Sequence, residues 1–539
     1  MYARGREVCA IQEIEPRLET DADKAPETTA AAAPDAGERR ALVASVFVVG
    51  LCSIVYELLV STTSSYFLGD SIRQFSLTIG VYLAGMGLGS YLVRFLRGEA
   101  VGLFVRAELA LGLVGGLSVP LLYGYFAAVG YAGFQAVMLA TVATVGTLTG
   151  LEIPLLTRLL APHFRGEEAL SNVLTLDYVG ALAATLLFPF VLLPLVGVFQ
   201  SSLAFGAVNV AVAIYAALRL GRGERRLAIA GAALLALLGA GFGLSAKLLA
   251  AWRDALFRDP IVYTEQTPYQ SLTMTRRGDD TRLYIDRVIQ WSATDEYRYH
   301  ESLVHPTLSS VHAPRRVLVL GGGEGLAVRE VLRHESVDSV TVVDIDPAVF
   351  RLARTQPQLL RLNERALFDP RVRTVARDAF VFLREVTTPY DAIVVDLPDP
   401  STDAVARLYS VEFFRLCRRA LRAGGGLATQ ATGPFHTRRA FWSIGATLRE
   451  AGFGESRPYH AYVASFGEWG FWMSPGELGG PRDVDFPTRY YTPGQFAHDT
   501  HFPADIGPVA VEPNGLDRPV LLDYYLDDWR RWSGERTVW

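Results

Sequence analysis

The stretch RRVLVLGGGEGLAVREVL, residues 315–332, decides the fold of the C-terminal half of the chain. It begins with a continuous apolar run, which is typical of a strand that is covered on both faces. Four glycines and one acid follow, and glycine permits the tight connection that a strand needs before a helix. The residues after the glycines have helical spacing. The stretch therefore predicts a strand, a turn and a helix, the unit from which parallel sheets are built.

The same alternation continues along the chain. Further strand candidates are SVTVVD at 339–344, VRTVA at 372–376, DAIVVD at 391–396 and GLATQA at 426–431, with helical stretches between them. Strands that alternate with helices imply a parallel sheet covered on both faces. Before this unit, the segments YQSLTMTRR and TRLYIDRVIQWS are joined by GDD and predict a small β-hairpin element. We expect a small β domain over 261–312, an α/β domain over 313–480 and a C-terminal extension over 481–539.

The first half of the chain is apolar. Residues 1–40 mix acidic residues with Ala, Thr and Pro and predict a flexible tail. A helix needs roughly 20 residues to cross a hydrocarbon core of about 30 Å. Seven blocks reach that length, near 41–62, 75–96, 102–126, 132–157, 177–198, 201–220 and 227–250. They predict a helical membrane domain over 41–252. Glu57, Glu108 and Glu152 lie inside these blocks, either as functional carboxylates or as hydrogen-bonding groups between helices.

The charge pattern leaves the orientation open. With seven spans, the positive-inside rule puts the C-terminal half outside the cytoplasm, because most arginines fall in alternate connections. These are Arg39, Arg40, Arg94, Arg97, Arg158, Arg165, Arg219, Arg222, Arg225 and Arg226. Lys247, Arg253 and Arg258, at and after the end of the last block, favour the opposite orientation.

Overall charge and cysteine content exclude some classes of function. The net charge is -5, which gives no basic footprint for a phosphate backbone, so nucleic acid is not an expected partner. Cys9, Cys52 and Cys417 are far apart and support neither a disulfide framework nor a metal cluster.

The predicted strand ends carry carboxylates. Ligands of parallel sheets bind beyond the carboxyl ends of the strands, where Asp344, Asp378 and Asp396 follow their strands. Glu324, in the glycine-rich turn, would repel a pyrophosphate and attract a sulfonium or an ammonium. Asp344 is suited to ribose hydroxyls and Asp378 to an adenine amino group. As alternatives, Asp344 can cap a helix, and Asp396 and Asp399 can be turn residues.

Taken in order, these residues resemble the spermidine synthase (polyamine aminopropyltransferase) family over about 262–475. The matching motifs are YQS at 269–271, LYIDRVIQWSATDEYRYHE at 283–301, GGGEGLAVREVL at 321–332, VVDID at 342–346, RDA at 377–379 and DLPDP at 396–400. PYHAYVASFGEWGF at 458–471 and the apolar half, through VYELL, GMGLGS and LEIPLL, are similar to its membrane-attached branch. The resemblance implies a small β element followed by a Rossmann-like, class I methyltransferase-like domain.

The resemblance also implies roles for single residues. Asp396 would accept the proton, aided by Tyr299. The other implied contacts are with the donor, through Gln270, Glu324, Asp344, Asp378 and Ala379, and with the acceptor, through His300, Glu324, Asp396, Leu397, Pro398 and Asp399.

The chain departs from the family pattern at four of these motif positions. The family usually has Asp at Glu324, Glu at Asp344, and Gly at Arg287 and Ala379. The two acidic exchanges keep the charge but move it by about one methylene. An Arg287 side chain that pointed into the site would conflict with a diamine acceptor.

The resemblance implies an aminopropyltransferase that uses decarboxylated S-adenosylmethionine as a co-substrate, with putrescine as acceptor and with no cofactor or metal. Because this donor is made in the cytosol, we expect a multi-pass protein of the cell membrane with a cytoplasmic catalytic domain, acting as a homo-oligomer in the lipid bilayer. Two other functions remain open. One is an S-adenosylmethionine-dependent methyltransferase. The other is a membrane polyamine transporter or sensor whose nucleotide-like domain only binds.

Overall fold

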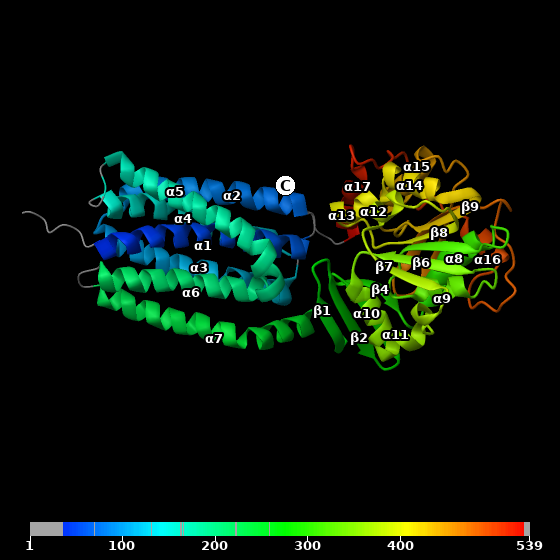
Figure 1. The fold of residues 1–539 in the computed structure, drawn as a ribbon, viewed down its shortest axis with the longest axis horizontal. Helices are drawn as coiled ribbons and strands as arrows, with labels where there is room; N and C mark the ends of the chain where they lie inside the picture. The colour runs from blue at the N-terminus through cyan, green and yellow to red at the C-terminus, as the bar shows by residue number, and fades with distance from the viewer. Residues whose placement is uncertain are drawn as a thin grey trace, which may run out of the picture.

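The computed structural model describes residues 36–68, 71–130, 132–161, 164, 166–220, 224–257 and 259–532. A bundle of long helices and an α/β half lie end to end (Figure 1). Residues 1–35 of the expected tail lie outside the described residues, whereas residues 36–40 already belong to the first helix.

Among the described residues, seven helices are long and apolar enough to cross a membrane, as the sequence predicted. They are α1 (Ala36–Leu68), α2 (Ser71–Leu92), α3 (Ala100–Val129), α4 (Phe134–Leu160), α5 (Gly166–Leu187), α6 (Val198–Arg219) and α7 (Arg225–Leu256). The fifth helix starts well before the apolar block expected at 177–198, because its first turns are polar and were not counted in that block. It continues as a π-helical segment, η3 (Phe188–Val196). Leu83, Leu182 and Phe190 are exposed, which gives the bundle an apolar outer surface.

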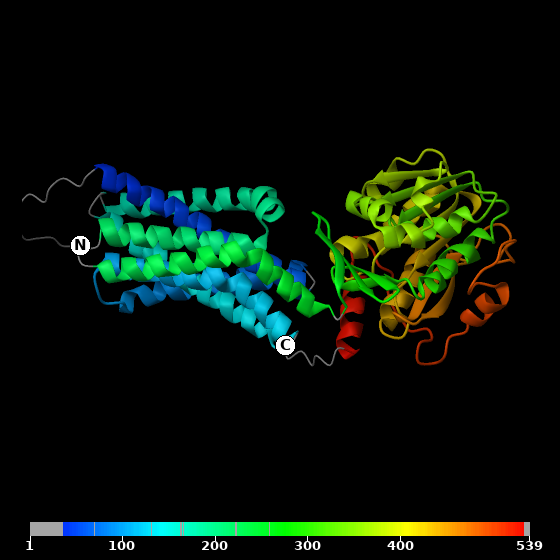
Figure 2. The ribbon, with the colours of Figure 1, turned by 90° about the horizontal axis from the view of Figure 1, so that it is seen from below.

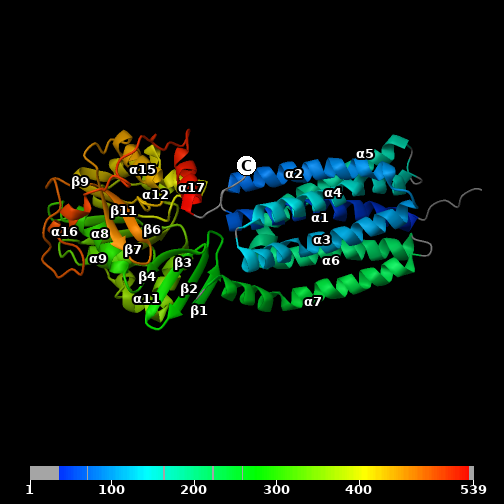
Figure 3. The ribbon, with the colours of Figure 1, turned by 180° about the vertical axis from the view of Figure 1, so that it is seen from behind.

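Successive helices run in opposite directions along the bundle. The chain enters α1 at the end far from the α/β half and leaves α7 beside that half (Figures 1 and 3). The connections after α2, α4 and α6 are therefore at the far end, where Arg94, Arg158, Arg219 and Arg225 lie. The arginine-rich connections and the α/β half are thus at opposite ends of the bundle.

The large sheet has seven strands in the order β10-β11-β9-β8-β5-β6-β7. They are β5 (Arg316–Gly321), β6 (Ser339–Asp344), β7 (Val372–Ala376), β8 (Tyr390–Asp396), β9 (Leu421–Gln430), β10 (Arg457–Val463) and β11 (Gly467–Ser474). The five strands from β9 to β7 are parallel, which confirms the predicted α/β fold. The sequence did not predict the hairpin of β10 and β11, which adds antiparallel strands beside β9.

Both faces of this sheet are covered. Along β5, Val317 and Val319 belong to one apolar core, and Leu318 and Leu320 to the other, because successive side chains of a strand point to opposite faces. The main covering helices are α8 (Glu296–Leu308), α9 (Leu326–Leu332), α10 (Pro347–Thr355), α11 (Pro357–Leu362), α12 (Ala379–Arg384), α13 (Asp403–Ala406), α14 (Val411–Ala420), α15 (Arg438–Glu450), α16 (Pro493–Asp499) and α17 (Val520–Trp532).

A separate four-stranded antiparallel sheet lies between the bundle and the large sheet (Figure 2). Its strands are β1 (Ile261–Gln266), β2 (Ser271–Arg277), β3 (Asp280–Ile285) and β4 (Val288–Ser292). The segment expected as one strand, TRLYIDRVIQWS, is two strands, because the chain turns at Asp286 and Arg287 with φ of 48° and 69°. Positive φ at both central residues is the geometry of a tight hairpin.

We predict that Gly445→Ala destabilises the α/β half by about 1–3 kcal/mol, the usual cost of overpacking a core. A Cβ on this α15 glycine would lie 2.0 Å from the buried indole of Trp472 on β11. Urea unfolding of the full chain in detergent, followed by tryptophan fluorescence, should show a lower midpoint. Gly454→Ala is the control, since a Cβ at that position would have no heavy atom within 4 Å. Equal midpoints for the two variants would refute this packing.

Candidate active site

The ends of three neighbouring strands bring the predicted carboxylates together. Gly321 at the end of β5 pairs with Asp396 at the end of β8, and on the other side of β5, Leu320 pairs with Val343, the residue before Asp344. The loop from β5 to α9, which carries Glu324, therefore lies over two aspartates at one edge of the sheet.

Glycine is required where this loop approaches the strand ends. Gly321 and Gly322 have φ of 81° and 60°, and a Cβ on Gly321 would lie 1.9 Å from the carbonyl oxygen of Asp396. A Cβ on Gly323 would lie 2.7 Å from Asp344 Oδ2, which instead accepts a hydrogen bond from the Gly323 amide at 3.2 Å. The glycines thus let the backbone pack directly against the carboxylates.

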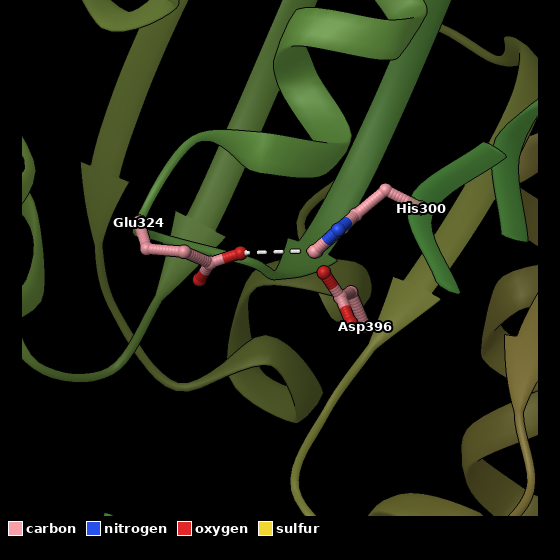
Figure 4. A group of neighbouring side chains, drawn as sticks. All are labelled: His300, Glu324 and Asp396. Atoms are coloured by element: carbon pink, nitrogen blue, oxygen red, sulfur yellow. Dashed lines mark ion pairs between the residues drawn. The ribbon is translucent and has the colours of Figure 1, made fainter. Parts of the chain in front are cut away.

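His300, Glu324 and Asp396 point toward one another (Figure 4). One side-chain atom from each lies within 4.8 Å of the others, and His300 Nε2 is 3.7 Å from Glu324 Oε1. Helix α8 carries His300 and also Tyr299, whose hydroxyl donates to Asp396 Oδ1 at 2.8 Å. Tyr299, His300, Glu324 and Asp396, all of them predicted site residues, therefore form one cluster.

His300 is held as a cation. Its Nδ1 lies 2.8 Å from Glu296 Oε2, one turn earlier on α8, and Arg329 binds both oxygens of Glu296 at 2.9 and 3.0 Å. Burial disfavours the charged imidazole, but hydrogen bonds to Glu296 and Glu324 outweigh it and raise the pKa of His300 to about 10. Spacing alone would allow a metal ion between His300, Glu324 and Asp396. As a cation, the imidazole can donate from both ring nitrogens, and it pairs with the carboxylates of Glu296 and Glu324.

The two aspartates titrate near neutrality. Burial, followed by the charge of Glu324, raises the pKa of Asp396 to about 6, while His300 and Tyr299 act in the opposite direction. Burial and Glu324 also raise the pKa of Asp344 to about 7, against the hydrogen bonds from the Asp346 and Gly323 amides. At neutral pH Asp396 is thus ionised and still basic enough to take a proton.

The other predicted residues surround this cluster at different positions. Gln270 lies directly before β2 and donates to Asp346 at 3.1 Å, close to Asp344. Asp378 caps α12, where Ala379 is the first helical residue, and forms an ion pair with Arg407. Asp399 accepts a hydrogen bond from Tyr525 at 2.9 Å. The carbonyl oxygen of Leu397 accepts a hydrogen bond from Gln430 at 2.7 Å, and that of Pro398 accepts one from Tyr409 at 3.0 Å. These two bonds fix the backbone before Asp399.

The structure adds residues that the sequence analysis missed. The sequence contained a signal for Glu296, because a carboxylate four residues before a histidine lies on the same face of a helix. Tyr525 carries no such signal, since it reaches Asp399 from a helix 126 residues away in the chain. An aromatic group around Tyr299 also went unnoticed, with ring centroids 5.3–6.4 Å from it: Phe466, Trp469 and Phe471.

Arg287 lies outside the cluster. Its Nη2 is directed at the end of α1 and donates to the carbonyl oxygens of Tyr66 and Phe67 at 3.3 and 3.5 Å. The conflict with a diamine acceptor that an inward side chain would create therefore does not arise.

Residues 296–476 match the family model described as the spermine/spermidine synthase domain. A solved spermidine synthase in complex with the transition-state analogue AdoDATO is 23% identical, with a TM-score of 0.43, over 45% of this chain and 85% of that one.

Full-length relatives are closer in sequence. Polyamine aminopropyltransferase 2 of Ralstonia nicotianae is 44% identical over 90% of this chain and 98% of that protein. The polyamine aminopropyltransferase of Leptospira interrogans is 40% identical over 91% of this chain and 99% of that protein. Polyamine aminopropyltransferase 1 of Streptomyces coelicolor is 41% identical over 92% and 95%. With this identity over nearly the whole length of its relatives, the chain belongs to the polyamine aminopropyltransferase family.

Proposed function

We propose that the chain transfers the aminopropyl group of decarboxylated S-adenosylmethionine to a diamine such as putrescine, which yields spermidine and methylthioadenosine. The observation that carries this proposal is the cluster of Tyr299, His300, Glu324 and Asp396 at one sheet edge. It combines a base of suitable pKa with carboxylates that attract cations.

Donor binding is supported by the charge of the pocket. Glu324 lies in the glycine loop and Asp344 accepts a hydrogen bond from that loop, so a sulfonium would be stabilised there and a carboxylate repelled. This favours the decarboxylated donor over S-adenosylmethionine itself and so argues against a methyltransferase. Asp344 and Gln270 would bind the nucleoside. Asp378 and Ala379 would contact its adenine, with Arg407 holding the Asp378 carboxylate.

In the chemical step, a deprotonated amine nitrogen forms a bond to the aminopropyl carbon while the bond from that carbon to sulfur breaks. The electron pair leaves with sulfur as neutral methylthioadenosine. The acceptor enters as an ammonium ion without a lone pair, so its proton must leave first. Asp396 takes this proton, and Tyr299 orients the carboxylate through the 2.8 Å hydrogen bond. The sulfonium already leaves readily, so positioning and base catalysis are sufficient.

The acceptor side is supported by aromatic and carboxylate groups. Tyr299 and Trp469 provide ring faces, which attract ammonium groups and pack against methylenes. Asp399, held by Tyr525, would bind the distal ammonium together with the backbone of Leu397 and Pro398. His300 forms an ion pair with Glu324 across 3.7 Å and would keep that carboxylate oriented in the pocket.

The proposal includes the setting of the enzyme. The seven apolar helices would cross the cell membrane, with their exposed Leu83, Leu182 and Phe190 in contact with lipid or with a second copy in a homo-oligomer. We place the catalytic half in the cytoplasm because its donor is made there, although the arginines at the far end of the bundle favour the opposite orientation.

Asp396→Asn should reduce turnover by about 10²–10⁴-fold, the usual contribution of a general base, and leave donor binding measurable. Spermidine formation by the purified full chain, together with calorimetric binding of methylthioadenosine, checks this. Asp338→Asn is the matched control, because Asp338 is exposed and lies before β6 at the opposite edge of the sheet. Turnover that is unchanged in the Asp396 variant would remove this residue from its role, and a methylated product would replace the proposed reaction.

The pH dependence should follow the two raised aspartate pKa values. Asp396 and Asp344 must be ionised, and each becomes protonated as the pH falls through its pKa of about 6 or about 7. We expect kcat/KM for the donor to be constant only above about pH 8, to fall to about half its maximum near pH 7 and to fall more steeply below pH 6. His300, with a pKa of about 10, stays protonated throughout this range. A profile that falls only near pH 4 would contradict the raised pKa values.

The orientation can be determined by labelling. We expect a cysteine introduced at Arg97, which is exposed after α2, to react with an impermeant maleimide in intact cells. The variant should also carry Cys9→Ser, since Cys52 and Cys417 are buried. Reaction only after the cells are opened would place the catalytic half outside the cytoplasm.

A further inference from the structure

Arg287 joins the helical bundle to the small β sheet. It occupies the tip of the β3–β4 hairpin, and its guanidinium carbon lies 4.7–5.2 Å from the ring centroids of Tyr66, Phe67 and Phe126. One guanidinium nitrogen also donates to the carbonyl oxygens of Tyr66 and Phe67. The contact therefore combines hydrogen bonds with three aromatic faces.

The chemistry of this contact fits its place. Tyr66 and Phe67 are in the last turn of α1, where carbonyl groups have no partner within the helix and the helix dipole is negative. A planar guanidinium can bind such carbonyls and stack on aromatic rings at the same time, whereas an ammonium cannot stack. Arg287 thus caps α1 from another domain.

The other side of the same turn reaches the donor pocket. Asp286, next to Arg287, is bonded twice to Ser271: its amide donates to the Ser271 carbonyl at 3.0 Å, and its Oδ1 accepts from the Ser271 amide at 2.8 Å. Ser271 directly follows Gln270, whose side chain donates to Asp346. The Asp346 amide in turn donates to Asp344 at 2.9 Å.

We propose that Arg287 is a positioning residue through which the helical bundle fixes the donor-binding end of β2. The inference rests on the proposed function, in which Gln270 and Asp344 bind the donor nucleoside. The docked turn holds Ser271 and therefore the position of Gln270 over Asp346. Release of the turn from α1 would lower donor affinity without altering the base, Asp396, which lies on the large sheet.

Glycine is the informative replacement. Arg287 has φ of 69°, a conformation that glycine adopts without strain, so Arg287→Gly keeps the turn and removes only the side-chain contact. We expect a donor KM at least about fivefold higher, the lower end of typical coupling between sites, with kcat within about twofold of the wild type. The donor KM of Arg287→Lys should lie between that of the wild type and that of Arg287→Gly. Arg277→Ala is the control on the same sheet, because its side chain is 81% exposed.

A double-variant cycle tests whether the bundle itself is responsible. Phe126→Leu removes one of the rings around Arg287 from the membrane side. If both changes break the same contact, the double variant should raise the donor KM no further than Arg287→Gly alone. An unchanged donor KM in Arg287→Gly, a loss confined to kcat, or independent multiplication of the two effects overturns the inference.

The failure of the proposed function would be recognised separately. All assays use the full chain in nanodiscs, and a wild-type chain that forms no spermidine from decarboxylated S-adenosylmethionine and putrescine refutes the function alone. Calorimetric binding of methylthioadenosine to the same variants then still tests whether Arg287 positions the donor-binding residues. A weaker affinity for methylthioadenosine in Arg287→Gly than in Arg277→Ala supports the positioning role of Arg287, and equal affinities refute it.

Discussion

The site depends on one protonated histidine among carboxylates. Glu324, Asp344 and Asp396 lie close together beside adjoining strand ends, and burial together with the charge of Glu324 raises the pKa of Asp344 and of Asp396. His300 offsets this repulsion because Glu296 holds its proton on one side and Glu324 attracts it on the other. Without this cation the pKa of Asp396 would be raised further, and a protonated Asp396 could not accept a proton. Arg329 donates to both oxygens of Glu296 and so balances its buried negative charge, which His300 alone would balance only in part.

The regular part of the fold was predictable from the sequence, because it follows from local patterns. The apolar runs that end in Asp344 and Asp396 are strands with nearly the expected limits, and the seven apolar blocks are helices. What the sequence did not reveal depends on contacts between distant segments. The β10–β11 hairpin pairs with β9, and no local signal specifies that partner. The turn at Asp286 and Arg287 was missed because arginine stands where the usual Asp-Gly pair of a tight hairpin has glycine.

The same division applies to the site. Residues at strand ends were found because parallel topology places all carboxyl ends at one edge. The helix-capping role considered for Asp344 belongs instead to Asp346, whose side chain accepts a hydrogen bond at the start of α10. Asp344 accepts amide hydrogen bonds from both Gly323 and Asp346 and so holds the glycine loop as well as the following turn. Tyr525 could not be anticipated, because a helix that follows the predicted domain contributes it.

The position of the small β sheet explains why the two halves can act together. The chain passes from α7 directly into β1, and Phe257 in this connection packs against Tyr284 of β3, with ring centroids 5.0 Å apart. Arg287 provides a second attachment, at the end of α1. The small sheet is thus attached to the bundle at two points. Gln270 directly precedes β2 of this sheet, whereas Asp344 and Asp396 belong to the large one. In the proposed mode of donor binding, the contacts would therefore come from both sides, and the position of Gln270 relative to Asp344 would depend on how the helices hold the smaller sheet.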